Sequence, residues 1–265
     1  MRIIVTNFGT TGDLRPMLAL AVELRGRGHR IEMAFSPNHG DRIREHGFTF
    51  HPIGEDVSAQ QRRVNLEWAA NPETVDHYKI LEPITRGLPQ AFEELRAVCG
   101  GADLLVSGQA MPAARMVHEL TGIPFVSVQF GHFGGSGTPE FQKASDELIN
   151  PFRVSLGLPR LADPLTKDTN SPQLALHAIS RHVLRRPKNW PGHFHVVGYF
   201  FLEEKVEQGF PELEAFFASG EKPVIITFGS MSDDDPEELT DLFLEAIDEV
   251  GCRVVIQQNW SALEP

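Results

Sequence analysis

Two glycines and a carboxylate stand close together near the start of the chain, with the spacing Gly9-x-x-Gly12-Asp13. An aspartate in such a turn can cap a helix by accepting a backbone N–H of the first turn, which is worth about 1 kcal/mol. It can also act as a general base that takes a proton from a bound hydroxyl. The two roles are compatible, because capping holds the carboxylate ionised and aimed. The helix dipole would also make a capping Asp13 a weaker base.

The same spacing argues against two phosphate-binding motifs. The dinucleotide fingerprint requires G-x-G-x-x-G, whereas this turn reads G-x-x-G and has no third glycine. A P-loop requires G-x-x-x-x-G-K-[ST], and the turn has no such lysine. A nicotinamide-dependent oxidoreductase and a P-loop nucleotide hydrolase are therefore disfavoured.

The glycine turn joins a predicted strand to a predicted helix. Residues 2–6 are apolar and mostly β-branched, which is typical of a buried strand. From Leu14 onward, apolar residues recur at helical spacing until Gly26 and Gly28 end the pattern. Ligands of open α/β sheets bind outside the carboxyl ends of the strands, so Asp13 is expected at the mouth of such a sheet.

The alternation of strands and helices continues and predicts a Rossmann-like parallel sheet flanked by helices. A segment at 55–85 interrupts this regularity and is predicted to be either a lid or binding loop, or a plain surface excursion. Further strands are predicted at 30–35, 48–53, 103–107, 123–129 and 174–180, and helices at 38–46, 87–98, 110–120 and 141–156, the last broken at Pro151.

A glycine-rich loop follows the predicted strand 123–129 and should face Asp13. Its four glycines allow the backbone to approach a ligand closely, and Phe130 and Phe133 could line an apolar pocket. His132 could donate a hydrogen bond to a substrate oxygen, although a lone histidine in a loop is more often structural.

The opening pattern returns near the end of the chain, with a strand, a turn and an acidic helix start from residue 223. We therefore expect an N-terminal domain over 1–202, a linker with a short helix over 203–222, and the first βαβ unit of a second Rossmann-like domain over 223–265. Two strands and one helix cannot bury their own faces, so this unit is expected to pair with a second copy or another chain.

The amino-acid composition limits the kinds of partner that the protein is expected to bind. The 265 residues carry a formal charge of −12, which argues against a nucleic-acid surface. No apolar run approaches the roughly 18 residues of a transmembrane helix, which leaves peripheral membrane contact open. Cys99 and Cys252 lie far apart and predict two free, buried thiols in the cytoplasm. The 11 histidines show no metal-ligand spacing, so neither a metal nor a cofactor is expected.

Several stretches together resemble a known family. They are the Gly9–Asp13 turn followed by Pro16, the runs at 24–31 and 47–54, and the Pro187-Lys188-Asn189-Trp190-Pro191 segment that leads through 196–200 to Phe228-Gly229-Ser230-Met231. In these features the chain resembles the bacterial UDP-glycosyltransferases of the two-domain GT-B type. The nearest group contains sterol glucosyltransferases and glycopeptide-antibiotic glycosyltransferases.

The resemblance implies an inverting transfer of a sugar, expected to be glucose from UDP-glucose, to a hydroxyl of a hydrophobic acceptor such as a sterol or another natural product. It implies that Asp13 is the general base and that Gly229 and Ser230 contact the donor phosphate. From their loops, the remaining site residues are expected to be Gly9, Thr10 and Gly12 for the donor phosphate, and Trp68, Gln129, Phe130, His132 and Phe133 for the acceptor.

The chain departs from the family pattern in two ways. Thr11 stands where the sterol-type group has arginine, which leaves the acceptor class open. The donor motif of the family is expected beyond residue 265, so the isolated chain is expected to be inactive. The alternative is a non-catalytic acceptor-binding subunit or fragment that needs a separate donor-binding chain.

Overall fold

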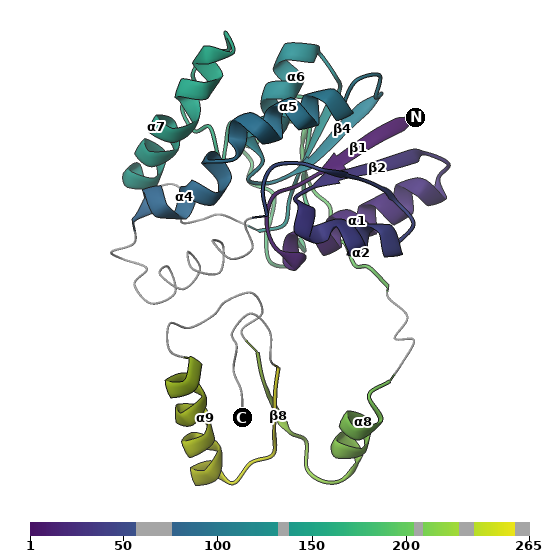
Figure 1. The fold of residues 1–265 in the computed structure, drawn as a ribbon, viewed down its shortest axis with the longest axis vertical. Helices are drawn as coiled ribbons and strands as arrows, with labels where there is room; N and C mark the ends of the chain where they lie inside the picture. Colours follow the sequence, from purple (N-terminus) through teal and green to yellow (C-terminus); the bar gives the residue numbers. More distant parts are fainter. Residues whose placement is uncertain (57–75, 132–137, 204–208, 228–235, 258–265) are drawn as a thin grey trace. The chain divides into compact units, whose positions relative to one another are not determined.

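The computed structural model describes residues 1–56, 76–131, 138–203, 209–227 and 236–257. These residues form two compact units, which divide after Leu202 (Figure 1). The first unit contains a seven-stranded sheet, and the second contains a two-stranded sheet.

All strand pairs of the first unit are parallel, in the order β3-β2-β1-β4-β5-β6-β7. This confirms the predicted parallel sheet. The chain builds β1 to β3 in one direction and then returns to place β4 on the other side of β1. The carboxyl ends of β1 and β4 therefore flank a topological switch point, where α/β proteins bind ligands. The strands are β1 (Arg2–Thr6), β2 (Arg30–Phe35), β3 (Thr49–Pro52), β4 (Leu104–Gly108), β5 (Phe125–Gln129), β6 (Leu174–His177) and β7 (Phe194–Val196).

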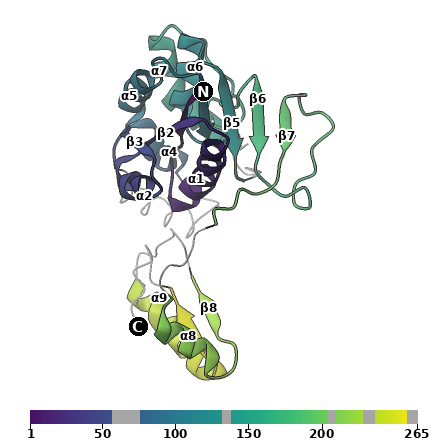
Figure 2. The same cartoon turned by 90° about the vertical axis from the view of Figure 1, so that its right-hand side faces the viewer.

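Helices cover both faces of this sheet (Figures 1 and 2). Side chains alternate along β1, so that Ile3 and Val5 enter one core layer and Ile4 enters the other. The layer around Ile3 and Val5 is closed by α1 (Thr11–Gly26) and α2 (Gly40–Glu45), and the layer around Ile4 by α4 (His77–Thr85), α5 (Leu88–Val98), α6 (Pro112–Thr121) and α7 (Pro139–Ser155). A short 3₁₀ helix, η1 (Pro37–His39), links β2 to α2.

Two expectations about prolines are wrong. Residues 77–85, expected to be irregular, form α4 with Pro83 inside it, and α7 runs without a break through Pro151. A proline inside a helix costs about 3 kcal/mol, so packing must offset it. Beside Pro151, the fully buried Asn150 side chain donates to the carbonyl of Leu161 at 2.8 Å and accepts from its N–H at 3.0 Å. This tertiary anchor holds the helix across the proline.

A buried carboxylate ties the first three strands together. Glu32 on β2 is 3% exposed and contacts Arg2 at 2.9 Å, Arg30 at 2.9 Å and His51 at 2.8 Å. The hydrogen bond from the Arg2 guanidinium is the main reason that the pKa of Glu32 is lowered to about 2. The cluster lies away from the switch point, and we interpret it as structural.

The second unit has one parallel pair, β8 (Val224–Ile226) and β9 (Val254–Ile256), with α8 (Pro211–Ala218) and α9 (Pro236–Val250). Cys252 is half-buried, contrary to the expectation of a buried thiol, whereas Cys99 in the first unit is buried. Burial raises the pKa of Cys99 to about 12. Within the described residues, no helix is long and apolar enough to cross a membrane, and no cluster of metal-ligating side chains occurs.

Candidate active site

Asp13 lies in the first turn of α1, directly after the loop that leaves β1, at position N3 of a capping box. The backbone N–H of Thr10 donates to Oδ2 of Asp13 at 2.8 Å, and the Thr10 hydroxyl donates to the same oxygen at 3.3 Å. The Thr10 hydroxyl in turn accepts from the N–H of Gly12 at 3.3 Å. Thr10 is therefore the N-cap, and the expectation that Asp13 itself caps the helix is wrong. The helix begins at Thr11, three residues before its apolar stripe at Leu14, because the capping box supplies its first turn.

Gly9 gives the loop its shape. Its φ angle of +135° is a conformation that side chains rarely allow. A Cβ at this position would lie only 2.2 Å from Oδ2 of Asp13 and 2.5 Å from its Cγ. The carboxylate therefore packs against the bare Cα of Gly9, and any larger residue would displace it.

Burial of the Asp13 carboxyl group raises its pKa above the ordinary range. The hydrogen bonds from Thr10 and the nearby charge of His39 act in the opposite direction, but they do not cancel the effect of burial. The expected weakening of the base by the capping hydrogen bonds is thus present, but it is smaller than the opposite effect of burial. A carboxylate with a raised pKa is a better proton acceptor near neutral pH.

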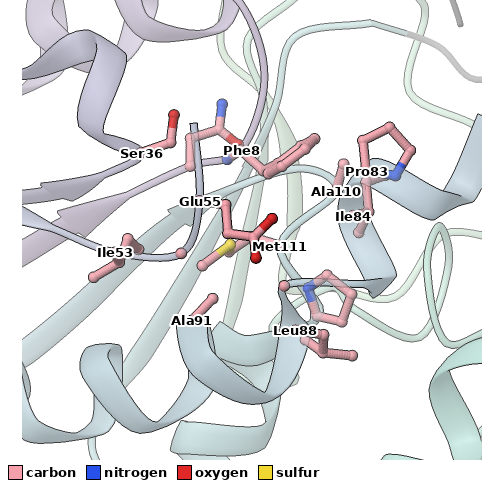
Figure 3. A pocket seen from close by; sticks show the side chains of 14 residues that line it. Phe8, Ser36, Ile53, Glu55, Pro83, Ile84, Leu88, Ala91, Ala110 and Met111 are labelled. Carbon is pink, nitrogen blue, oxygen red and sulfur yellow. The ribbon is translucent and has the colours of Figure 1, made fainter. Parts of the chain in front are cut away.

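A pocket opens at the same edge of the sheet and encloses about 440 Å³ of empty space, part of it open to solvent (Figure 3). Most of its lining is apolar, and Glu55 is the one charged residue among those that line it. The carboxylate of Glu55 also accepts a hydrogen bond from Arg86 at 2.7 Å. The lining residues are Asn7, Phe8, Ser36, Ile53, Gly54, Glu55, Pro83, Ile84, Gly87, Leu88, Ala91, Ala110, Met111 and Pro112.

Asn7 connects this pocket to the loop of Asp13. It is 2% exposed, lines the pocket, and its Oδ1 accepts from the N–H of Phe8 at 2.9 Å. Its Nδ2 donates to the backbone carbonyl of Asp13 at 3.4 Å. Gly108 at the end of β4 packs against it, since a Cβ there would lie 2.2 Å from Cγ of Asn7. The arrangement places a hollow able to take an apolar ligand near a half-buried carboxylate.

The structure brings together only part of the predicted site. Gly9, Thr10 and Gly12 gather around Asp13 in the first loop. Gln129 and Phe130 do not line the described pocket. The Gln129 amide donates to Oδ1 of Asn170 at 2.8 Å, and Phe130 packs in the core layer of α1. Five predicted residues lie outside the described part of the chain, namely Trp68, His132, Phe133, Gly229 and Ser230.

The sequence reasoning did not identify most of the residues that line the pocket. Ile53 to Glu55 follow β3, and Ala110 to Pro112 follow β4, so their positions after predicted strands were an available signal. Asn7 and Phe8 follow β1 and Ser36 follows β2, whereas the rest of the wall comes from α4 and the start of α5. That wall was not predicted, because the segment before α5 showed no regular pattern.

Comparison with known proteins identifies the first unit. Residues 3–133 match the glycosyltransferase family 28 N-terminal domain. The chain is 27% identical over 277 residues to a dTDP-epi-vancosaminyltransferase of Amycolatopsis orientalis, covering 99% of this chain and 66% of that protein. It is 27% identical over 293 residues to a sterol 3-beta-glucosyltransferase of Leptosphaeria maculans, covering 98% of this chain and 20% of that protein.

Among solved structures, the glycotransferase of kitacinnamycin matches with a TM-score of 0.67 at 16% identity, covering 96% of this chain and 64% of that one. The parallel sheet, its flanking helices and this likeness define a protein of the GT-B glycosyltransferase fold. Residues 3–133 match the model of the glycosyltransferase family 28 N-terminal domain, and the chain's homologues are glycopeptide-antibiotic glycosyltransferases and sterol glucosyltransferases. The chain spans about two thirds of the length of the vancosaminyltransferase.

Proposed function

We propose that this protein transfers a sugar from a nucleotide-diphosphate donor to a hydroxyl of an apolar acceptor, a sterol or another natural product, with inversion at the sugar carbon. One observation carries the proposal: a half-buried carboxylate, Asp13, is held at the switch point of the sheet near a mostly apolar pocket. The family of residues 3–133 and the names of the homologues support it.

In this mechanism the acceptor binds in the pocket and presents its hydroxyl to Asp13. The hydroxyl oxygen attacks C1 of the sugar in line with the departing nucleotide diphosphate, and Asp13 takes the proton. An ordinary aspartate has a pKa near 3.9, far below that of an alcohol, so the proton moves late, after the oxygen has become acidic. The raised pKa of Asp13 favours this step, and general-base assistance contributes roughly 10²–10⁴ in rate.

The nucleotide-sugar donor is the second substrate of the proposed reaction. We assign the diphosphate to backbone N–H groups at Gly229 and Ser230, because such turns suit an oxyanion, and we propose Gly9, Thr10 and Gly12 of the first loop as further donor contacts. UDP-glucose is the first donor to test. A dTDP-sugar is the second, since one homologue is named for a dTDP-linked sugar. We further propose that residues 1–265 alone do not catalyse sugar transfer. We also propose that the protein acts in the cytoplasm and needs no cofactor.

The test replaces Asp13 with asparagine in the full-length protein, because the amide keeps the shape of the side chain and loses the proton acceptor. Sugar transfer to a panel of sterols and other hydrophobic alcohols is followed by mass spectrometry with each donor. We expect turnover to fall roughly 10²-fold or more, with little change in acceptor affinity. Unchanged turnover would refute the role of Asp13. Acceptor binding without transfer from either donor would favour the non-catalytic binding subunit.

A further inference from the structure

His39 is a buried ring that the mechanism above leaves without a role. It ends η1, directly after β2, and is 6% exposed. Its ring meets that of Phe35 edge-on at 6.2 Å between centroids. Its Nε2 lies 3.0 Å from the carbonyl oxygen of Gly9. Because a carbonyl oxygen can only accept, Nε2 must carry the proton, which fixes the hydrogen-bonding role of this nitrogen.

The partner of His39 is the peptide group that also holds the proposed base. The carbonyl of this group belongs to Gly9, and its N–H belongs to Thr10. His39 donates to the carbonyl at 3.0 Å, and the N–H donates to Oδ2 of Asp13 at 2.8 Å. One peptide plane thus has the histidine at one end and the carboxylate at the other. Donation to the carbonyl polarises the amide and strengthens its own donation to the carboxylate.

The backbone conformation of Gly9 makes the orientation of this peptide group depend on its hydrogen bond with His39. A φ angle of +135° at Gly9 is not one of the backbone conformations that most residues prefer. Contacts with neighbouring groups must therefore fix the orientation of the peptide plane between Gly9 and Thr10. Asp13 contacts the Cα of Gly9 on one side, and His39 holds its carbonyl. Loss of the histidine donor would allow the plane to rotate and would weaken the Thr10 N–H bond to Asp13.

We propose that His39 is a positioning residue for Asp13, acting through the peptide group that joins Gly9 to Thr10. The proposal rests on the proposed function for its effect on turnover, but the hydrogen-bond chain can be tested without any activity. The hydrogen bond of the ring goes to the backbone and not to the carboxylate, which it otherwise affects through its nearby charge, so His39 differs from a residue that touches the substrate.

Two variants separate the donor from the ring. His39→Phe keeps a planar ring and removes the donor, whereas His39→Gln retains an N–H near the position of Nε2. In the full-length enzyme we expect His39→Phe to lower kcat about tenfold, the equivalent of one ordinary hydrogen bond, with little change in the acceptor KM. His39→Gln should restore most of the loss.

His46→Phe is the matched control. His46 ends α2, and its Nδ1 also lies beside a backbone carbonyl, that of Arg42, at 2.8 Å. It is a histidine–backbone contact of the same kind outside the loop of Asp13. We expect its kcat to stay within about twofold of the wild type.

The second measurement is made on the 265-residue chain by NMR at a pH where Asp13 is ionised. The Thr10 amide proton, bonded to a carboxylate, should resonate downfield, move upfield in His39→Phe, and return in His39→Gln. An unchanged Thr10 resonance in His39→Phe would overturn the proposal, as would equal losses in both variants, since the ring shape alone would then matter. If no donor supports transfer by the wild type, the proposed function fails, and the Thr10 resonance still decides the role of His39.

Discussion

Replacement of Gly9 by alanine tests the close approach of the first loop to the proposed base. The added Cβ would lie 2.2 Å from Oδ2 of Asp13, so the carboxylate must move or the loop must open. A positive φ costs a non-glycine residue about 1–2 kcal/mol. Loss of the Thr10 N–H bond to a charged carboxylate adds about 1.5–3 kcal/mol. We therefore expect Gly9→Ala to lower the free energy of unfolding by roughly 2.5–5 kcal/mol.

Gly122→Ala is the control for backbone strain alone. Gly122 caps the C-terminal end of α6 with φ of +72°, and a Cβ there would meet nothing within 4 Å. Its substitution should cost only the roughly 1–2 kcal/mol of the positive φ. The difference between the two variants then measures the displacement of Asp13. It is obtained from urea denaturation of the 265-residue chain.

Under the proposed function, Gly9→Ala should also reduce the turnover of the protein. A displaced Asp13 loses general-base assistance, so kcat should fall roughly 10²-fold or more in Gly9→Ala. Gly122→Ala should retain activity at temperatures where it stays folded. If Gly9→Ala unfolds no more easily than Gly122→Ala and keeps its turnover, the packing of Asp13 against Gly9 is not what holds the base.

Two further predictions concern the ion cluster and the pocket. Glu32→Gln should lower the free energy of unfolding at pH 7 by about 3 kcal/mol, because the pKa of Glu32 falls from 4.5 to about 2 on folding. The wild type loses this stability as the pH drops below 4.5 towards 2. Urea denaturation should therefore show that the free energies of unfolding of the two proteins converge at acid pH. A difference that stays constant with pH would contradict this role of Glu32. Ala91→Phe, which fills the pocket from α5, should raise the acceptor KM about tenfold, whereas Gln90→Phe on the exposed side of α5 should not. Equal KM values in the two variants would place the acceptor elsewhere.

The layout of the sheet could be predicted because its strands are short apolar runs separated by helical patterns. β1 and α1 were predicted to within three residues, since a β-branched run and a spaced apolar stripe identify them directly. The helices that contain Pro83 and Pro151 were not predicted correctly. Local sequence marks each proline as a helix breaker, whereas at Pro151 tertiary hydrogen bonds of Asn150 decide the outcome.

The candidate site divides in the same way. Asp13 could be selected from the glycine spacing alone, because a carboxylate after a switch-point strand is a local feature. Its partial burial could not, and desolvation outweighs the hydrogen bonds that lower its pKa. Gln129 illustrates the other limit: the amide that binds Asn170 pairs residues 41 apart, and no local pattern encodes that partner.

The base and the pocket are built from different stretches of chain. Residues between Asn7 and His39 shape the first loop and the turn that holds Asp13, whereas most of the pocket wall comes from 53–55, 83–91 and 110–112. Substitutions in the wall can therefore alter which molecules fit without disturbing the carboxylate. Such a division allows the acceptor range to diverge during evolution while the chemistry is inherited unchanged. It also makes the segment 53–91 the natural piece to exchange between homologues when a new acceptor is sought.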